Sequence, residues 1–304
     1  MQPYQVPPRY YQPPRRRWRK TFENCLFSCG TLLFLMLVLL AAGMVFYVFN
    51  PPPPQNILLL GNDARPGTGE DQIARTDSIM ILGVNPGQRE ISLLSLPRDV
   101  TINSPTFGAL RANTIVRNSE LNQPGSGVAE MIASMEYTFN TDIDHSVRVS
   151  FQGFVDLVDA LGGVNIDVPK YIIDYSYPTH DNGTMTIEFQ AGEQHMDGET
   201  ALIYARTRHG DTDYERARRQ QQVIDAILAK LRNPLNLYRL PVVMAAFSNN
   251  VDTNMGIDDM FAVVPGLILY GFGDINRLVI DNEYLNGSQP DMTKVSPWIQ
   301  QHLE

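Results

Sequence analysis

Arginine and aspartate residues gather in four short clusters of this 304-residue chain. A guanidinium binds phosphate through two parallel hydrogen bonds, and a carboxylate holds hard divalent cations. The combination indicates a site for a pyrophosphate with a divalent metal. The clusters are GNDAR at 61–65, ARTDS at 74–78, LPRDV at 96–100 and YARTRHGDTDYERARRQ at 204–220.

Three short apolar runs can bring the first three clusters together. The runs at 56–60, 77–84 and 90–96 each predict a buried strand, and Asn85-Pro-Gly-Gln88 predicts a turn between the last two. A hairpin places the start of its first strand beside the end of its second. If the run at 56–60 pairs antiparallel with the run at 77–84, all three clusters meet at one edge of a sheet.

The fourth cluster leads into the clearest predicted helix, at 215–231. Its apolar stripe runs through Val223, Ile227 and Leu231, and at 100° per residue Arg216 and Gln220 extend that stripe. Arg219 lies at its margin and Arg218 points the opposite way. Polar residues that continue a buried face near a helix N-terminus favour an anion site.

Neighbouring arginines and aspartates have a simpler interpretation as structural ion pairs. Four clusters at one edge weaken that interpretation, because the arginines outnumber the carboxylates and an excess of half-buried cations is costly without an anion. A metal-bound pyrophosphate supplies that anion. No zinc-binding HExxH, CxxC pair, Walker loop or GxSxG competes as a site.

The N-terminal part of the chain predicts a membrane anchor. Residues 25–49 carry no charged side chain and are long enough to span a bilayer. Arg15 to Lys20 precede the span, so the N-terminus is expected in the cytoplasm and the rest outside. A cleaved signal peptide is the alternative, but the run is long for one and lacks a small-residue cleavage site. The predicted parts are a disordered basic tail at 1–24, a transmembrane helix at 25–49, a proline-rich linker at 50–55 and an extracytoplasmic domain at 56–304.

The chain has a net charge of −9, and the basic tail at 1–24 makes the remainder more acidic still. The remainder therefore does not bind nucleic acid through bulk charge. Cys25 and Cys29 are the only cysteines, so the outer domain has no disulfide. Beyond the strands already named, we expect helices at 126–139 and 152–160, strands at 145–151 and 164–168, a helix from Asp197 to Tyr204, a helix near 258–270 and a strand at 277–280.

The motifs resemble the LytR–CpsA–Psr (LCP) family over about residues 55–255. The matching runs are NILLLGNDAR, RTDSIMILGVNP, SLLSLPRDV, FVDLVDALGGVNIDVP and MDGETALIYARTRHGDTDYERARRQQQVI, in collinear order. The resemblance implies an α/β fold, with a mixed central β-sheet flanked by helices and a single transmembrane helix before it. It also implies an Mg²⁺-dependent phosphotransferase, with Mn²⁺ as the alternative ion. Such an enzyme moves a glycopolymer from a polyprenyl pyrophosphate carrier to peptidoglycan, at the outer face of the cell membrane.

The resemblance also implies roles for residues. Asp63 and Asp77 would bind the metal. The pyrophosphate-binding residues would be Arg65, Arg75, Arg98, Arg206, Arg208, Arg216, Arg219 and Gln220. The catalytic set would be Arg98, Asp99, Arg208 and Asp213, where the two carboxylates orient arginines and one carboxylate of the site acts as base. An apolar channel for the lipid would involve the faces of 126–139 and 151–160.

The chain departs from the family pattern in two places. Arg111-Ala112-Asn113, followed by Pro124-Gly-Ser-Gly127, replaces a usual Lys-Ile/Leu-Asn motif and Gly-Gly turn, in a loop expected at the substrate mouth. Glu215 replaces a usual glycine before Arg216. Two other functions stay open: a membrane-anchored pyrophosphatase that acts on the same lipids with water, and a non-enzymatic regulator that binds lipid pyrophosphate.

Overall fold

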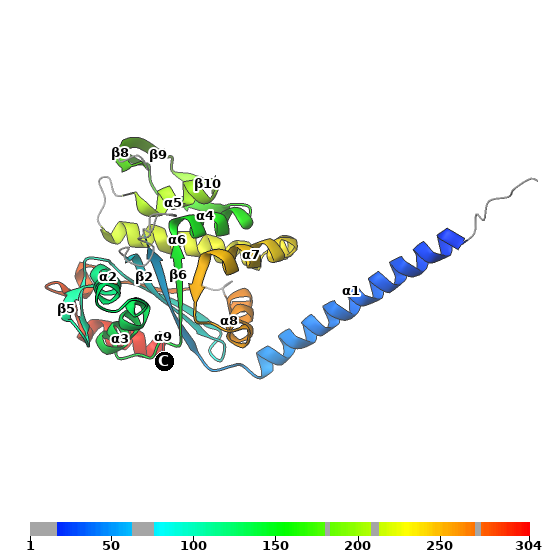
Figure 1. Ribbon diagram of the computed structural model, residues 1–304, viewed down its shortest axis with the longest axis horizontal. Coiled ribbons are helices and arrows are strands. Elements are labelled where there is room, and N and C mark those ends of the chain that lie inside the picture. The colour runs from blue at the N-terminus through cyan, green and yellow to red at the C-terminus, as the bar shows by residue number, and fades with distance from the viewer. Residues whose placement is uncertain (1–16, 63–75, 180–182, 208–212, 271–274) are drawn as a thin grey trace, which may run out of the picture. The chain divides into compact units, whose positions relative to one another are not determined.

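The computed structural model describes residues 17–62, 76–179, 183–207, 213–270 and 275–304 (Figure 1). The chain divides into two units, Met1–Pro51 and Pro52–Glu304. Helix α1 (Arg17–Phe49) belongs to the first unit and includes the predicted span at 25–49. Within the described residues, no helix has both the length and the hydropathy that a bilayer crossing requires. The anchor and the proposed domain boundaries stay predictions.

A six-stranded mixed sheet forms the centre of the second unit, in the order β11-β6-β1-β2-β3-β12. Strand β2 is antiparallel to both β1 and β3, which confirms the predicted hairpin and the predicted pairing of the first strand. Strand β6 is parallel to β1, β12 is parallel to β3, and β11 is antiparallel to β6. The bounds are β1 (Gln55–Asn62), β2 (Thr76–Asn85), β3 (Glu90–Leu96), β6 (His145–Ser150), β11 (Val251–Thr253) and β12 (Asn276–Val279).

Helices cover both faces of this sheet, which is why its central strands are almost continuously apolar. Leu58 and Ile81 point to one face and Ile57 and Leu82 to the other, as the two-residue period of a strand requires. The predicted α/β fold with a mixed central sheet flanked by helices is confirmed.

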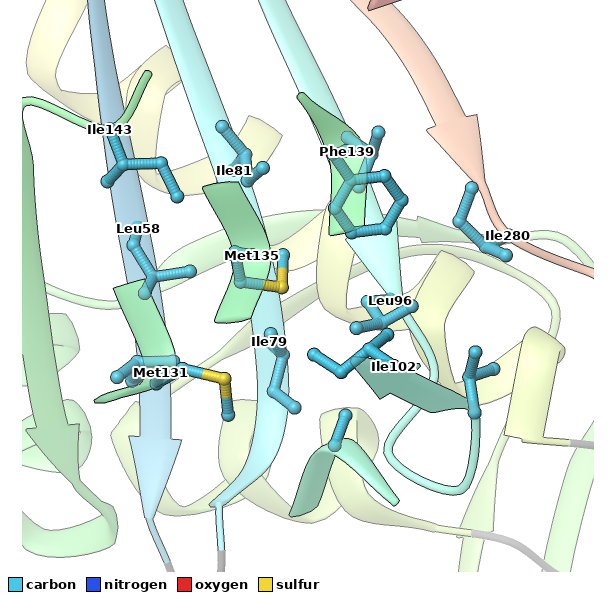
Figure 2. Packing of buried hydrophobic residues seen from close by; sticks show 14 of the residues in the cluster. Leu58, Ile79, Ile81, Leu96, Ile102, Met131, Met135, Phe139, Ile143 and Ile280 are labelled. Atoms are coloured by element: carbon cyan, nitrogen blue, oxygen red, sulfur yellow. The ribbon is translucent and has the colours of Figure 1, made fainter. Parts of the chain in front are cut away.

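The first face packs against α2 (Ala112–Asn122), α3 (Gly127–Phe139) and α9 (Met292–His302). Figure 2 shows Met131, Met135 and Phe139 of α3 lying over Leu58 and Ile81 of the sheet. These three side chains are at most 1% exposed. The apolar face predicted at 126–139 therefore contributes to the core, and the lipid channel expected along it stays a prediction.

Helix α2 corrects an expectation. The resemblance places Arg111-Ala112-Asn113 and Pro124–Gly127 in a loop at the substrate mouth. Residues 112–122 are helical instead, and Ile115 and Val116 are buried in the core under α3. Tertiary burial overrides the weak local propensity here. Before α2 comes a small hairpin of β4 (Thr101–Ser104) and β5 (Gly108–Arg111), which the sequence analysis did not foresee.

The second face packs against α6 (Asp213–Arg232) and α8 (Ile257–Tyr270), through Leu228 and Val263. Beyond α6 lies a further apolar cluster built from α4, α5 and the smaller sheets. It includes the hairpin of β8 and β9, labelled at the top of Figure 1. The bounds are α4 (Phe151–Ala160), β7 (Val164–Val168), β8 (Ile172–Pro178), β9 (Thr184–Phe189), β10 (Gly192–Met196) and α5 (Gly198–Arg206).

Close contact between α4 and α5 depends on one glycine. A Cβ at Gly198 would lie 2.3 Å from the carbonyl oxygen of Val155, so only glycine fits there. Asp197 begins α5 as predicted, because its carboxylate accepts a 2.9 Å hydrogen bond from the Thr200 amide. The remaining elements are η1 (Pro234–Arg239), α7 (Leu240–Asn250), η2 (Asn282–Tyr284), β13 (Leu285–Asn286) and β14 (Gln289–Pro290).

One edge of the large sheet collects the ends of four strands. Because β1, β3, β6 and β12 run in the same direction and β2 runs opposite, the first four end where β2 begins. We call this edge the carboxyl rim. Ligands of open α/β sheets bind outside the carboxyl ends of strands, so the rim is where a site is expected.

Candidate functional site

A cavity of about 560 Å³ opens at the carboxyl rim and is called here the rim cavity. Its volume is within the range of small-molecule sites in proteins. Side chains from the β2–β3 hairpin and from α5 and α6 line it, although the hairpin and these two helices are far apart in sequence. The predicted site residues in its lining are Asp77, Arg98, Arg206, Arg216 and Gln220.

The hairpin of β2 and β3 brings two of these residues into contact. Asp77 is the second residue of β2, and Arg98 follows the last residue of β3 by two positions. The Nη1 atom of Arg98 donates a 2.7 Å hydrogen bond to Oδ1 of Asp77. Asp99 has its Oδ2 atom 3.6 Å from Nε of Arg98, so it flanks this arginine from outside the cavity lining.

Helix α6 supplies the next pair through its helical phase. Arg216 and Gln220 are one turn apart and both line the cavity, and Arg216 is only 4% exposed. Arg218 faces away as the periodicity predicts, because its side chain is 55% exposed and pairs with Glu215 at 2.8 Å. Arg219, predicted at the margin of the stripe, is buried and donates to the backbone oxygen of Thr207.

Arg206, the last residue of α5, is held by two aromatic rings. Its guanidinium carbon lies 4.0 Å from the centre of the Phe151 ring, at the start of α4. Its Nη1 atom donates a 3.2 Å hydrogen bond to the hydroxyl of Tyr177 in β8. Burial raises the pKa of the Tyr177 phenol, and the charge of Arg206 partly opposes that shift. The phenol is therefore protonated at neutral pH and can donate to an anion.

The β8–β9 hairpin contributes residues that sequence analysis missed. Asp174 is 5% exposed and lines the cavity together with Ser176 and Tyr177. Its Oδ2 atom accepts a 2.9 Å hydrogen bond from the Thr207 hydroxyl, and its Oδ1 atom accepts from the Ser176 amide at 3.0 Å. The backbone oxygen of Thr207 also accepts a hydrogen bond from Arg219. By holding Thr207, the Asp174 carboxylate helps to position both Arg219 and the neighbouring Arg206.

Several predicted site residues lie outside the described residues. These are Asp63, Arg65, Arg75 and Arg208. Asp213 is described only as the first residue of α6. Their predicted roles, like those of the residues in the cavity, stay predictions. Asn62, which immediately precedes Asp63, ends β1 at the rim beside Thr76.

The described lining carries the charges that an anion site needs. Arg98, Arg206 and Arg216 contribute three guanidiniums, and Asp77 and Asp174 contribute two carboxylates. Asp174 is already engaged by Thr207 and a backbone amide, so the three guanidiniums outnumber the one remaining carboxylate, that of Asp77. Three guanidinium forks around one cavity favour an oxyanion with several acceptor oxygens.

Oxygen donors near Asp77 fit a hard cation. The Oδ1 atom of Asn62 is buried and has no hydrogen-bond partner among the described residues. It lies at the end of β1, next in register to the start of β2 that carries Asp77. Carboxylate and amide oxygens are the ligand types that Mg²⁺ takes in proteins. No group of three or more acidic, histidine or cysteine side chains suited to a metal occurs among the described residues.

A sequence profile of the LytR_cpsA_psr family matches residues 46–295. The chain belongs to the LytR–CpsA–Psr family. The resemblance drawn from the sequence motifs is confirmed.

Known LytR–CpsA–Psr relatives include enzymes named for teichoic acid transfer. The polyisoprenyl-teichoic acid–peptidoglycan teichoic acid transferase TagV of Bacillus subtilis (strain 168) is 30% identical over 265 residues, covering 82% of this chain and 64% of TagV. The corresponding transferase TagU of Bacillus cereus (strain ZK / E33L) is 32% identical over 210 residues, covering 68% of this chain and 62% of TagU. The chain thus spans less than two thirds of the length of either relative.

Solved structures share the LytR–CpsA–Psr fold. The crystal structure of B. subtilis TagV has a TM-score of 0.65 at 28% identity, covering 83% of this chain and 97% of that one. A structure of TagT bound to LIIa-WTA has a TM-score of 0.62 at 23% identity, covering 83% and 91% of the two chains. The mixed sheet and its helices are therefore the family's fold.

Proposed function

We propose that this chain transfers a glycopolymer from a polyprenyl pyrophosphate carrier to peptidoglycan through a phosphodiester bond. The observation that carries the proposal is the convergence of Asp77, Arg98, Arg206, Arg216 and Gln220 on the rim cavity. Relatives at about a third identity are named as transferases of this kind. Transfer from a pyrophosphate carrier requires a site that neutralises the pyrophosphate. The arginines that line the rim cavity supply the positive charge for this.

The transfer is an in-line displacement at phosphorus. A sugar hydroxyl of peptidoglycan forms a new oxygen–phosphorus bond to the phosphate that carries the glycopolymer. The bond from that phosphorus to the bridging oxygen breaks, and polyprenyl phosphate leaves with the bridging oxygen and its electron pair. The hydroxyl proton passes to a carboxylate of the site. The protein supplies positioning and charge neutralisation rather than covalent chemistry.

The arginines act on the charge that develops during this step. Arg98 follows β3 and Arg216 lies in the first turns of α6, and both line the cavity. Because they come from different elements, they can bind different oxygens of one pyrophosphate. Gln220 adds an amide donor, and Arg206 is kept in place by Phe151 and Tyr177. Donors already aimed at the developing charge lower the barrier because they need no reorganisation.

A divalent ion fits the oxygen donors at the end of β1 and the start of β2. Asp77 and Asn62, with the predicted Asp63, would hold Mg²⁺, and Mn²⁺ can take the same ligands. Bound there, the ion would neutralise charge on the pyrophosphate oxygens. Arg98 contacts Oδ1 of Asp77 in the described arrangement and would turn to the substrate when the pyrophosphate arrives.

The apolar run at 25–49 would anchor the chain in the cell membrane, with the N-terminus in the cytoplasm. The prolines at 51–54 would form a stiff spacer before β1. Protease added to intact protoplasts should then digest the second unit and spare a tag placed on the N-terminus. A protected second unit would reverse this orientation and remove access to peptidoglycan.

The proposal is tested with full-length protein in detergent, a polyprenyl pyrophosphate glycopolymer, peptidoglycan sacculi and Mg²⁺. We expect radiolabelled polymer to become inseparable from sacculi after boiling in detergent. Water-soluble polymer without attachment would indicate a pyrophosphatase, and unchanged lipid-linked polymer that stays bound to the protein would indicate a binding regulator. Either result would overturn the transfer reaction.

A further inference from the structure

Helix α6 borders a second cavity, of about 400 Å³, which we call the flanking cavity. It lies between α6, β12 and the short helix η2. Its lining includes the polar side chains of Arg218, Gln222, Asp225, Arg277, Asp281 and Tyr284, together with the apolar residues Leu278 and Val279. The volume is large enough for a small ligand group. None of these residues takes part in the rim cavity.

The two cavities lie on opposite sides of the same helix. Arg218, Gln222 and Asp225 follow one another at four- and three-residue spacing, so they share one face of α6. Arg216 and Gln220 share the opposite face, about 160–200° around the helix from Arg218 at 100° per residue. An α-helix with its side chains is about 10–12 Å across. The flanking cavity is therefore a close neighbour of the rim cavity.

Both cavities also belong to the carboxyl rim. Strands β3 and β12 are parallel neighbours, and the Ile280 amide donates a 3.0 Å hydrogen bond to the Ser95 oxygen where the two strands end. Arg98 follows β3 and Asp281 follows β12. A ligand held beside Asp281 is thus at the same edge of the sheet as the phosphate-binding arginines.

The charges of the flanking cavity differ from those of the rim cavity. The Nη2 atom of Arg277 is 2.7 Å from Oδ2 of Asp225, and the Nη2 atom of Arg218 is 3.6 Å from Oδ2 of Asp281. Each guanidinium in the lining is therefore matched by a carboxylate, so the cavity has no charge excess to attract an anion. What remains is a dense set of donors and acceptors, to which Gln222 adds an amide and Tyr284 a phenol.

Such a set suits a neutral, polyhydroxylated ligand. Planar carboxylate, guanidinium and amide groups can each engage two neighbouring hydroxyls, and an aromatic ring can cover the apolar face of a sugar. We propose that the flanking cavity binds a sugar unit of the glycan acceptor, next to the unit whose hydroxyl attacks phosphorus. This inference rests on the proposed transfer function and adds a separate acceptor subsite to it.

Arg218→Ala and Arg277→Ala test the proposal in the full-length protein. Each should raise the KM for glycan acceptor about tenfold, as expected when a charged hydrogen-bond donor to a ligand is lost, while the KM for the lipid pyrophosphate donor stays unchanged. The matched control is Arg148→Ala, which removes another arginine–aspartate pair, with Asp252 at 2.6 Å, on the β6–β11 edge outside both cavities. It should leave both KM values unchanged.

Binding provides a test that does not depend on turnover. Chitotetraose, a neutral N-acetylglucosamine tetramer, is titrated into the protein, and binding is followed by saturation-transfer NMR. Wild-type protein and Arg148→Ala should bind it, and Arg218→Ala and Arg277→Ala should bind at least several-fold more weakly, with thermal melting as the folding control. Equal binding by all four proteins would overturn the subsite, and so would an unchanged acceptor KM, even if transfer itself occurs. Chitotetraose binding that is lost in the variants would support it even if no transfer occurs.

Discussion

The carboxylate of Asp77 accepts a 2.7 Å hydrogen bond from Arg98, although the two residues are 21 positions apart. The contact follows from hairpin register, because the start of β2 and the end of β3 are adjacent at the carboxyl rim. Both side chains are partly open to the rim cavity. In the proposed reaction, the guanidinium of Arg98 would bind the pyrophosphate and the carboxylate of Asp77 would bind the metal.

Replacement of Asp77 should separate these roles. We expect Asp77→Ala to lower turnover of lipid pyrophosphate about 10²–10³-fold, comparable with loss of one preorganised charge-stabilising group, and to weaken Mn²⁺ binding. Binding is measured by the EPR signal of free Mn²⁺ without substrate, so it does not depend on activity. Asp252→Ala, which removes an exposed carboxylate at the β11 edge, is the control. Wild-type turnover and Mn²⁺ binding in Asp77→Ala would remove this residue from the site.

Arg216 and Arg218 give a matched test of helical phase. Arg216→Ala should reduce binding of the donor pyrophosphate by tenfold or more, because a charge-assisted hydrogen bond contributes about 1.5–3 kcal/mol. Arg218→Ala should leave donor binding unchanged, since this side chain faces the other side of α6. Donor binding is measured by equilibrium titration with circular dichroism as a folding control. Equal losses in the two variants would contradict an inward-facing clamp.

Thr207 connects the β8–β9 hairpin to the arginines. In Thr207→Val the buried carboxylate of Asp174 loses its hydroxyl donor, so we expect the free energy of unfolding to fall by about 1–3 kcal/mol, together with a loss of turnover. Thr207→Ser keeps the hydroxyl and should retain most of both. Urea denaturation and steady-state kinetics on the same preparations measure the two effects. If Val and Ser variants are equally active, the hairpin does not position the site.

The rim was predictable because its residues sit at the ends of elements with clear patterns. Asp77 and Arg98 bracket two apolar strands joined by a turn, and Arg216 continues the apolar stripe of a helix. Asp174 and Tyr177 carried no such signal. Their partners, Thr207 and Arg206, are 33 and 29 residues away, and nothing in the local pattern of 172–178 indicates those contacts. Asp174, which directly follows Ile172 and Ile173, was the one available sign.

Asp197 allows a test of stability against pH. Hydrogen bonds from Thr200 lower the pKa of its carboxyl below the ordinary 3.8, so the folded state favours the charged form. The stabilisation is therefore present above pH about 4 and is lost as pH falls through the folded-state pKa. Asp197→Ala should lower the free energy of unfolding by about 0.5–2 kcal/mol at pH 7, and by less at pH 3. Urea denaturation at both values checks this, and an equal loss at both would contradict the charged cap.

The most direct test of the transfer reaction is the fate of the phosphate oxygens. Full-length protein is incubated with lipid-linked glycopolymer and peptidoglycan in water enriched in ¹⁸O, and muramidase digests are analysed by mass spectrometry. Transfer predicts a muropeptide joined to the polymer through a phosphodiester without ¹⁸O, because the attacking oxygen comes from a sugar. Polymer that ends in an ¹⁸O-labelled phosphate, with no muropeptide adduct, would show that water is the acceptor and would contradict the proposed function.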